Sequence, residues 1–320
     1  MAPGKREKSG SLTLSQRLPS GRIVQRAPLT YNGNTLEPLS CDRPVLVVRP
    51  ESGWIPLNLK EVWKYRELLY FLVWRDVKVK YKQTVLGALW AILQPLLTMV
   101  VFTVFFGRMA KVGSDGFPYP IFSYAALLPW ILFAQGVSQS ADSLVGSSNL
   151  VRRVYFPRAV IPVSSVVSGL VDFGLAFLVL IAMMAFYGVH PGIAVLWLPA
   201  LVLICVLTSL GVGMWLSALN VEYRDVRYVV PFFLQLWLFV TPVIYPASGV
   251  VSFLEGHGVP MWMYGLNPMV GVVEGFRRAL LGGDAAVGPL VITGVVVSAL
   301  LLLTGAYYFR RMERTFADVV

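Results

Sequence analysis

Charged residues are scarce in this chain: Asp, Glu, Lys and Arg together make up 14 % of its 320 residues. Hydrophobic residues make up 56 %, and the mean hydropathy is +0.67. A soluble domain could not bury that much apolar surface, so the composition excludes an ordinary soluble protein. The sequence therefore predicts an all-α protein that is integral to a membrane.

Cysteine and histidine are also rare, with two residues of each. Cys41 lies before the apolar segments and Cys205 lies within one, so both are expected to be free thiols. His190 and His257 show no spacing with Cys, Asp or Glu that is typical of metal ligands, so no metal site is expected. The chain also lacks the G-x-x-x-x-G-K-[ST] phosphate loop, so we expect neither a cofactor nor ATP on this chain.

Six apolar segments are candidates for membrane spans, each of which takes about 20 helical residues. The second of them is short and contains Pro129, and the fifth contains Pro231 and Pro242. Either is a candidate for a broken or re-entrant helix. The six segments are residues 86–107, 121–137, 160–187, 193–217, 229–246 and 288–309.

The distribution of the 27 lysines and arginines predicts the orientation of these spans. If the N-terminus is cytoplasmic, the outer loops hold only Arg108, Lys111, Arg277 and Arg278. The positive-inside rule then predicts six spans with the N- and C-termini both in the cytoplasm. Because cations that flank a membrane account for the net charge of +10, no nucleic-acid partner is expected.

The composition divides the chain near residue 50. Residues 1–50 are rich in Lys, Arg, Pro, Ser and Gly, which predicts a flexible cytoplasmic tail, with a short strand near residues 45–48. Residues 51–85 are expected to form an amphipathic helix at the membrane interface. Residues 86–320 are expected to form the six-span domain.

The interface helix is predicted from apolar residues at helical spacing, with Arg75, Lys78 and Lys82 on the opposite face. Asp76 and Lys80 are four residues apart and are expected to pair. The cationic face has two interpretations. It is either a solvated face that contacts membrane lipid beside a span, or a surface that also contacts a cytoplasmic partner.

Four segments, in the same order along the chain, resemble the permease subunits of ABC-2 type exporters of polysaccharides and polyol phosphates. The resemblance covers roughly residues 55–315. It implies six spans, a homodimer, and two copies of a separate ATPase subunit that binds ATP and Mg. The implied substrate is a lipid-linked O-antigen, capsule or teichoic acid polymer, and the implied location is the bacterial inner membrane. The segments are LLYFLVWRDVKVKYKQTVLGALWAILQPL (68–96), NLVRRVYFPRAVIPVSSVVSGLVDF (149–173), LNVEYRDVRYVVPFFLQLWLFVTPVIYP (219–246) and LNPMVGVVEGFRRALLG (266–282).

The resemblance also implies that the segment between the second and third spans docks into the ATPase. Its first residue is a candidate helix N-cap, and its proline ends or redirects the chain. Two aromatic residues are expected to form an apolar anchor, and three arginines a polar rim. The alternative is that these aromatic residues and arginines are ordinary membrane-interface residues. The implied docking residues are Asn149, Leu150, Arg152, Arg153, Tyr155, Phe156, Pro157 and Arg158.

A second polar segment, residues 220–228, lies between the fourth and fifth predicted spans. Glu222, Arg224, Asp225 and Arg227 are expected to form a local ion-pair network that holds these two spans together.

Aromatic residues are the candidates for the lining of an export channel, because sugars offer apolar ring faces. In the outer segment 247–287, Asn267 and Pro268 predict the start of a helix. The resemblance implies a periplasmic gate there, and the alternative is a helix that merely covers the bundle. The channel candidates are Trp90, Phe102, Phe105, Phe106 and Tyr124, and the gate candidates are Trp262, Tyr264 and Phe276.

Asp172 is the only carboxylate well inside a predicted span, and an acid in that position suggests a function by default. It raises the alternative of a proton-coupled secondary transporter. The sequence shows no basic partner for Asp172 and no inverted repeat, which argues against that class. A membrane-bound glycosyltransferase would require paired carboxylates or a metal cluster, and neither is evident.

Overall fold

The computed structural model describes residues 15–17, 23–25, 29–32, 35–38, 63–82, 87–148, 150, 156–282, 288–313 and 316. The chain forms two compact units, Met1–Gly53 and Trp54–Val320.

The first unit contains two short antiparallel hairpins. Strand β1 (Ser15–Arg17) pairs with β2 (Ile23–Gln25), and β3 (Leu29–Asn32) pairs with β4 (Thr35–Pro38). These four strands were not predicted from the sequence, which indicated a flexible tail with one short strand further along the chain. The strand predicted near residues 45–48 lies outside the described residues.

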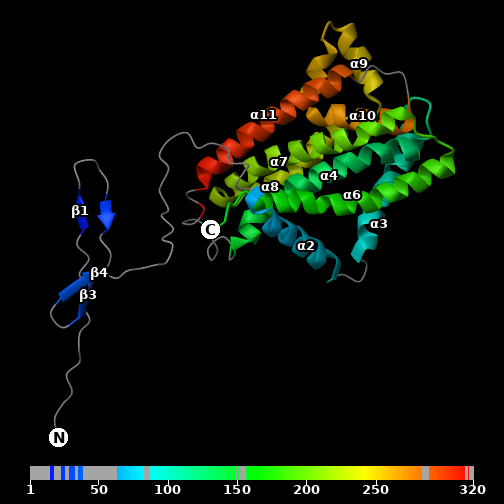
Figure 1. Ribbon diagram of the computed structural model, residues 1–320. Helices are drawn as coiled ribbons and strands as arrows, with labels where there is room; N and C mark the ends of the chain where they lie inside the picture. The colour runs from blue at the N-terminus through cyan, green and yellow to red at the C-terminus, as the bar shows by residue number, and fades with distance from the viewer. Residues whose placement is uncertain are drawn as a thin grey trace. The chain divides into compact units, whose positions relative to one another are not determined.

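The described residues of the second unit form helices joined by turns and loops, with no strand among them, which confirms the predicted all-α membrane fold. Helices α4, α6, α7 and α11 run alongside one another (Figure 1). The elements are α2 (Arg66–Lys82), α3 (Gly87–Phe102), η1 (Thr103–Met109), α4 (Tyr119–Gly146), α6 (Val160–Tyr187), η2 (Ile193–Trp197), α7 (Leu198–Glu222), α8 (Val226–Val240), α9 (Ala247–Gly256), η3 (Met261–Leu266), α10 (Pro268–Leu281) and α11 (Gly288–Met312).

Among the described residues, five helical stretches are long and apolar enough to cross a membrane: Gly87–Met109, Tyr119–Gly146, Val160–Tyr187, Ile193–Glu222 and Gly288–Met312. The predicted fifth span is shorter than expected, because α8 has only 15 residues. Pro242 directly follows Thr241, which is extended, and a residue before proline is disfavoured in a helix. Helix α8 thus ends at Val240, before the predicted end of the span at residue 246, as expected of a broken or re-entrant helix.

Helix α4 differs most from its predicted span. The sequence suggested a short second span interrupted by Pro129, but α4 runs unbroken for 28 residues through that proline. Most of its side chains are buried, and it packs against α6, α7 and α3 at the centre of the bundle. A proline is tolerated in such a helix because its neighbours can satisfy the freed backbone groups.

Small residues allow α7 to approach its neighbours closely. A Cβ atom on Gly305 of α11 would lie 2.2 Å from the carbonyl oxygen of Gly211 on α7. A Cβ on Gly213 would lie 2.5 Å from the Oγ of Ser140 on α4. Close backbone approach at small residues is the usual way that membrane helices associate. These contacts make α4, α7 and α11 the rigid centre of the unit.

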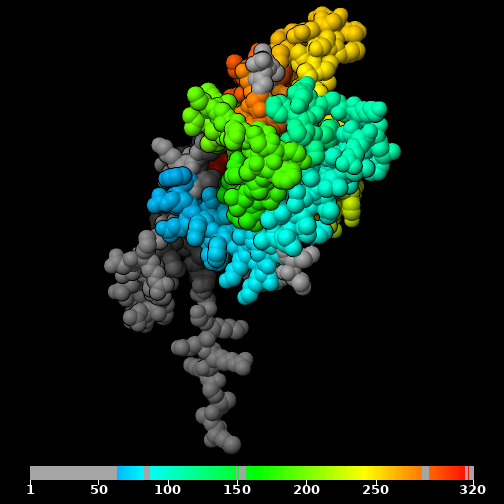
Figure 2. All heavy atoms as spheres, turned by 90° about the vertical axis from the view of Figure 1, so that its right-hand side faces the viewer, coloured from blue at the N-terminus to red at the C-terminus, as the bar shows by residue number. Residues whose placement is uncertain are grey.

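The bundle has two ends that differ in composition. At the end where α11 finishes, here called the α2 end, Leu72 of α2 packs with Phe156, Phe309 and Phe316 in a second buried cluster. At the opposite end, called the α9 end, α9 stands at the tip of the bundle, with α10 beneath it (Figure 1). Along one side, α2 lies beside α6, and α3 adjoins α6 (Figure 2).

Candidate functional site

The most distinctive polar contact near the α2 end joins α2 to α6. Lys80 Nζ forms an ion pair with one carboxylate oxygen of Asp172, and Tyr81 Oη donates a hydrogen bond to the other. Asp172 is 7 % exposed, whereas about half of the Lys80 side chain is accessible. Burial and the neighbouring carboxylate of Asp172 raise the pKa of Tyr81, so its hydroxyl remains a donor at neutral pH. We call this contact the Asp172 clamp.

The clamp corrects one inference from the sequence. Asp172 was expected to have no basic partner, yet Lys80 is 92 residues away and reaches it from another helix. Asp76, which was expected to pair with Lys80, accepts hydrogen bonds from Arg75 in the structure, the shorter at 2.8 Å. The ion pair therefore makes α2 part of the bundle rather than a helix attached only to lipid.

Two adjoining polar cavities lie beneath α2. The first, of about 380 Å³, is bounded by α2, α4 and α6 and includes the Asp172 clamp. The second, of about 360 Å³, continues towards the end of α4 and shares Arg75, Asp76 and Gln139 with the first. Gln139 makes no hydrogen bond to another described residue. The cavities offer donors and acceptors with nearly balanced charge, which suits water or hydroxyl-rich ligands better than an anion.

The predicted cationic face of α2 is only partly present. Lys78 and Lys82 are exposed, but Arg75 is partly buried beside Asp76 and lines both cavities. The exposed side of α2 also carries large aromatic and apolar residues that belong at a membrane interface or against a partner. These are Tyr70, Phe71, Trp74 and Val79, and Trp63 is exposed shortly before α2 begins.

The described residues of the predicted docking segment follow α4 and precede α6, and Leu150 and Phe156 pack in the buried cluster of the α2 end. Asn149, Arg152, Arg153 and Tyr155 lie outside the described residues. Among the others, Leu150 and Pro157 are partly buried.

The resemblance implied that Phe156 is part of an apolar anchor for the ATPase, but in this arrangement it is 5 % exposed and packs in the buried cluster of the α2 end. The residues that bury Phe156 come from helices far away in the sequence. Arg158 is partly buried and contacts Glu313, which follows α11.

The second polar segment contains no ion pair. Glu222, Arg224, Asp225 and Arg227 are all exposed, and no contact between these four side chains is formed. The predicted network is thus not present, because α7 ends at Glu222 and the short turn before α8 points its charges outwards. Instead, Asn220 ties α7 to α4 by donating hydrogen bonds to Ala141 O at 3.0 Å and to Asp142 Oδ1 at 3.1 Å.

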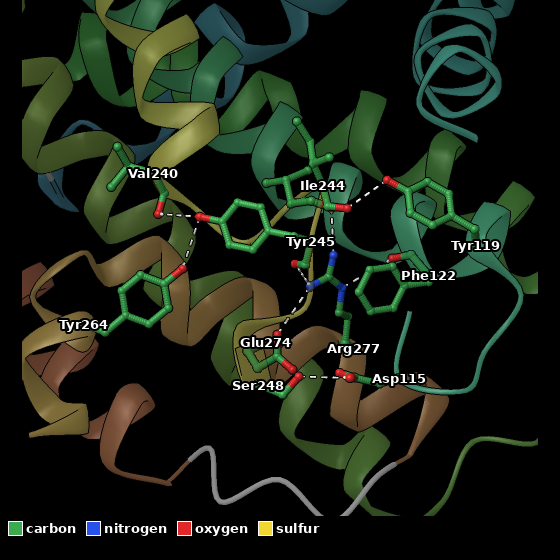
Figure 3. A network of polar contacts seen from close by, with 11 residues as sticks. Asp115, Tyr119, Phe122, Val240, Ile244, Tyr245, Ser248, Tyr264, Glu274 and Arg277 are labelled. Carbon is green, nitrogen blue, oxygen red and sulfur yellow. Dashed lines mark hydrogen bonds and ion pairs between the residues drawn. The ribbon is translucent and has the colours of Figure 1, made fainter. Parts of the chain in front are cut away.

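Arg277 organises the α9 end (Figure 3). It is 3 % exposed, and its guanidinium donates to Val243 O at 2.7 Å and to Tyr245 O at 3.1 Å. It also pairs with Glu274 at 3.4 Å and stacks on the ring of Phe122, with 3.6 Å from Cζ to the ring centroid. These contacts hold the chain between α8 and α9 against α10 and the start of α4.

Burial shifts the pKa values of this pair in opposite directions. It raises the pKa of Glu274, against the opposing effect of Arg277, and it lowers the pKa of Arg277 to about 10. The Arg277 guanidinium therefore stays charged at neutral pH. A charge buried in this way requires a partner, which Glu274 and the surrounding carbonyl groups provide.

Asn267 makes a second link at the same end. Its Oδ1 accepts a hydrogen bond from the backbone N–H of Met269, which confirms the predicted N-cap, with Pro268 as the first residue of α10. The same oxygen accepts a hydrogen bond from Trp237 Nε1 of α8 at 3.0 Å, and Asn267 Nδ2 donates to Thr241 Oγ1 at 2.9 Å. The end of α8 is thus fixed to the start of α10.

The channel candidates fall into two groups. Trp90 and Phe105 are exposed on the α3–η1 stretch, and Phe102 and Phe106 are partly buried and in edge contact with each other. Tyr124 is completely buried and donates a hydrogen bond to Ala176 O at 3.1 Å. In this arrangement it is a packing residue and offers no surface to a channel, because α4 is central rather than peripheral.

The gate candidates also differ from one another. Trp262 is 52 % exposed at the tip of the α9 end. Tyr264 is partly buried, and its hydroxyl oxygen lies 3.4 Å from that of Tyr245 (Figure 3). Phe276 is completely buried, in edge contact with Phe173, because the α10 face that carries it packs inwards on α4 and α7. Phe276 is a core residue in this structure.

Sequence reasoning missed three contacts that connect distant segments: the Asp172 clamp, the Arg277 network and the Arg158–Glu313 contact. Asp172 was visible as an acid in an apolar segment, but nothing in the sequence pointed to Lys80 or Tyr81. Arg277 was taken for an outer-loop cation. Among the described residues, no three His, Cys, Asp or Glu side chains lie close enough together to hold a metal ion.

Comparison with known proteins identifies the family. The family model described as "ABC-2 type transporter" matches residues 67–281, from α2 to the end of α10. This chain belongs to the ABC-2 type transporter family. The match includes the Asp172 clamp, the Arg277 network and the docking segment.

Named relatives align over most of this ABC-2 chain. It is 31 % identical to the O-antigen export system permease protein RfbA of Myxococcus xanthus over 82 % of this chain and 98 % of that protein. Identity to a protein of the same name in Klebsiella pneumoniae is 27 %, over 79 % of this chain and 95 % of that protein. Identity to the polysialic acid transport protein KpsM of Escherichia coli is 22 %, over 75 % of this chain and 91 % of that protein.

Proposed function

We propose that this chain is the permease subunit of an ABC exporter that moves a lipid-linked polysaccharide or polyol-phosphate polymer across the bacterial inner membrane. The observation that carries the proposal is the alignment to O-antigen and polysialic acid transport proteins over nearly their whole lengths. A separately encoded ATPase would bind ATP and Mg and would supply the energy, because the chain has no phosphate loop.

The exposed apolar surface supports a homodimer in the membrane. Helix α8 exposes large apolar side chains along most of its length, including Phe232, Leu236 and Phe239, and the α3–η1 stretch exposes Trp90 and Phe105. Lipid or a second copy of the chain would cover these surfaces. A channel between two copies would give the exposed aromatic residues access to sugar rings, whereas a polymer would not fit within cavities of a few hundred Å³.

The α2 end supports the proposed cytoplasmic orientation and ATPase contact. It combines the described end of the docking segment, residues 156–158, with the exposed charged residues Glu222, Arg224 and Asp225 that follow the buried end of α7. In the proposed topology, both termini are cytoplasmic and two ATPase subunits bind at this end. The α9 end, with its buried Arg277 network, would then face the periplasm as a gate or a cover.

Proton-coupled transport through Asp172 is the alternative, and no observation favours it. Both oxygens of the carboxylate are engaged by Lys80 and Tyr81. A proton carrier in this position would have to break these contacts in every cycle. The clamp gives Asp172 a sufficient role in holding α2 to α6.

The test is export from cells in which this gene and the gene of its ATPase partner are manipulated separately. Loss of the permease is expected to leave lipid-linked glycan in the inner leaflet, where a surface antibody cannot reach it. An ATPase variant that binds but does not hydrolyse ATP should give the same result with the permease present. Surface glycan that persists without ATP hydrolysis, and disappears when the proton gradient is dissipated, would support the alternative.

A further inference from the structure

The C-terminal residues after α11 contact the start of α6, where the docking segment ends. The backbone N–H of Arg158 donates a hydrogen bond to Glu313 Oε1 at 3.0 Å, across 155 residues of sequence. In return, Arg158 Nη1 donates to the backbone carbonyl of Glu313. The contact therefore involves both the main chain and the side chain of each residue, which fixes the two segments in register.

Glu313 supplies a carboxylate acceptor near the start of α6, where the local sequence has no capping side chain. Helix α6 begins at Val160, and its N-cap residue Ala159 has no side-chain oxygen to accept a hydrogen bond from the first turn. The first-turn N–H groups of α6 bond to carbonyls of the preceding turn, and Glu313 accepts from the N–H of Arg158 just before the helix. The partial positive charge at a helix N-terminus makes a carboxylate in that position stabilising. Glu313 brings that carboxylate from a distant part of the sequence, 155 residues after Arg158.

Apolar contacts support the same junction. Phe316 is completely buried, packs edge-on against Phe309 with 5.2 Å between ring centroids, and lies beneath the guanidinium of Arg158 at 6.0 Å. Phe156, two residues before Arg158, is buried in the same cluster. The last residues of the docking segment are thus held by residues that follow α11: Arg158 by Glu313 and Phe316, and Phe156 through the shared apolar cluster.

We propose that Glu313 and Phe316 position the docking segment, so that the C-terminal residues of this chain set the surface presented to the ATPase. The inference rests on the proposed function for the identity of the partner, but the positioning itself is a property of this chain alone. Glu313 and Phe316 are positioning residues and are not assigned any contact with the ATPase or with the transported polymer.

The first experiment measures the docking segment in the purified permease without its partner. The sequence offers a tryptic site after Arg153, within that segment. Glu313→Ala is expected to accelerate cleavage there about fivefold, because local opening becomes easier. Glu313→Gln keeps an acceptor oxygen and should be cleaved at close to the wild-type rate. Arg311→Ala, at an exposed residue in the last turn of α11, is the matched control.

Phe316→Ala provides an independent variant, which decides the question if Glu313→Ala does not accumulate in the membrane. It is also expected to accelerate cleavage after Arg153, because it removes the apolar contacts that Phe316 makes at this junction. Unchanged cleavage in every Glu313 or Phe316 variant that folds would overturn the proposal.

A second experiment adds the ATPase subunit in a pull-down. Glu313→Ala should retain several-fold less ATPase than wild type, with Glu313→Gln in between. If the wild-type chain retains no ATPase, yet the variants still accelerate cleavage, then the proposed function fails and the positioning role stands. If the wild type retains ATPase and the variants change neither measurement, the positioning role fails alone.

Discussion

Replacing Asp172 by Asn tests whether the Asp172 clamp holds α2 in place. The substitution keeps the size of the side chain but removes the charge that Lys80 and Tyr81 contact. The end of α2 would then be attached mainly by apolar contacts nearer its start, such as those of Leu72. Local opening of the last turn of α2 should become more frequent, without unfolding of the bundle.

The expected magnitude follows from the burial of the two partners. Removing one partner of a fully buried ion pair costs about 3–5 kcal/mol, but exposed pairs contribute only about 0–1 kcal/mol. Asp172 is buried and Lys80 is about half exposed, so we expect an intermediate value of about 2 kcal/mol. That energy corresponds to about a 30-fold change in an equilibrium constant.

The assay is backbone hydrogen exchange in the purified protein, followed at the last turn of α2. Under conditions in which exchange reports the opening equilibrium, Asp172→Asn should accelerate exchange at residues 79–82 by about 30-fold. Tyr81→Phe removes only the hydroxyl and should accelerate exchange about fivefold, for a loss of about 1 kcal/mol. Asp225→Asn removes an exposed carboxylate and serves as the control.

Exchange in the last turn of α2 that changes less than about twofold in Asp172→Asn would refute the reasoning. The clamp would then contribute no more than an exposed surface pair. Uniformly faster exchange in α4 and α7 would also contradict it, because the effect would belong to the whole bundle rather than to α2.

Three further perturbations have defined outcomes. Arg277→Met leaves Glu274 buried without its partner and should cost about 3–5 kcal/mol, seen as a lower thermal midpoint, with Glu274→Gln in the same chain recovering part of the loss. Gly305→Ala should reduce yield and thermal stability sharply, because its Cβ would overlap α7, whereas Gly174→Ala meets open space and should not. Replacing the exposed Lys78 and Lys82 by Glu should weaken binding to anionic vesicles by about 1 kcal/mol per charge. The protein should still insert into the membrane. Vesicle binding equal to that of wild type would contradict a lipid contact.

The sequence predicted the helical membrane fold well, because that signal is local. Long apolar runs identify spans wherever they occur, and the N-cap at Asn267 was recognised from two adjacent residues. Pro242 marked the end of α8 for the same reason. In each case, the physical cause lies within a few residues of the feature that it produces.

Predictions failed where burial depends on tertiary neighbours. Pro129 is a helix breaker by local rules, yet the packed surroundings of α4 allow the helix to continue. The resemblance implied an anchor role for Phe156 and a gate role for Phe276, but distant helices cover both side chains. The ion pair of Asp172 could not be found from spacing, because Lys80 is 92 residues away.

Helix α6 connects the two contacts that most directly suggest how the proposed exporter would work. The contact with Glu313 lies at its start, and Asp172 lies 12 residues beyond Val160, or about 18 Å along a helix with a rise of about 1.5 Å per residue. A helix of this length moves largely as a rigid element, so a displacement of the docking segment would reach α2 through the Asp172 clamp. Because α2 covers the polar cavities beside α4, the same displacement would change access to them. The Glu313 contact and the Asp172 clamp thus make α6 the element that would connect the proposed ATPase contact with the cavities beneath α2.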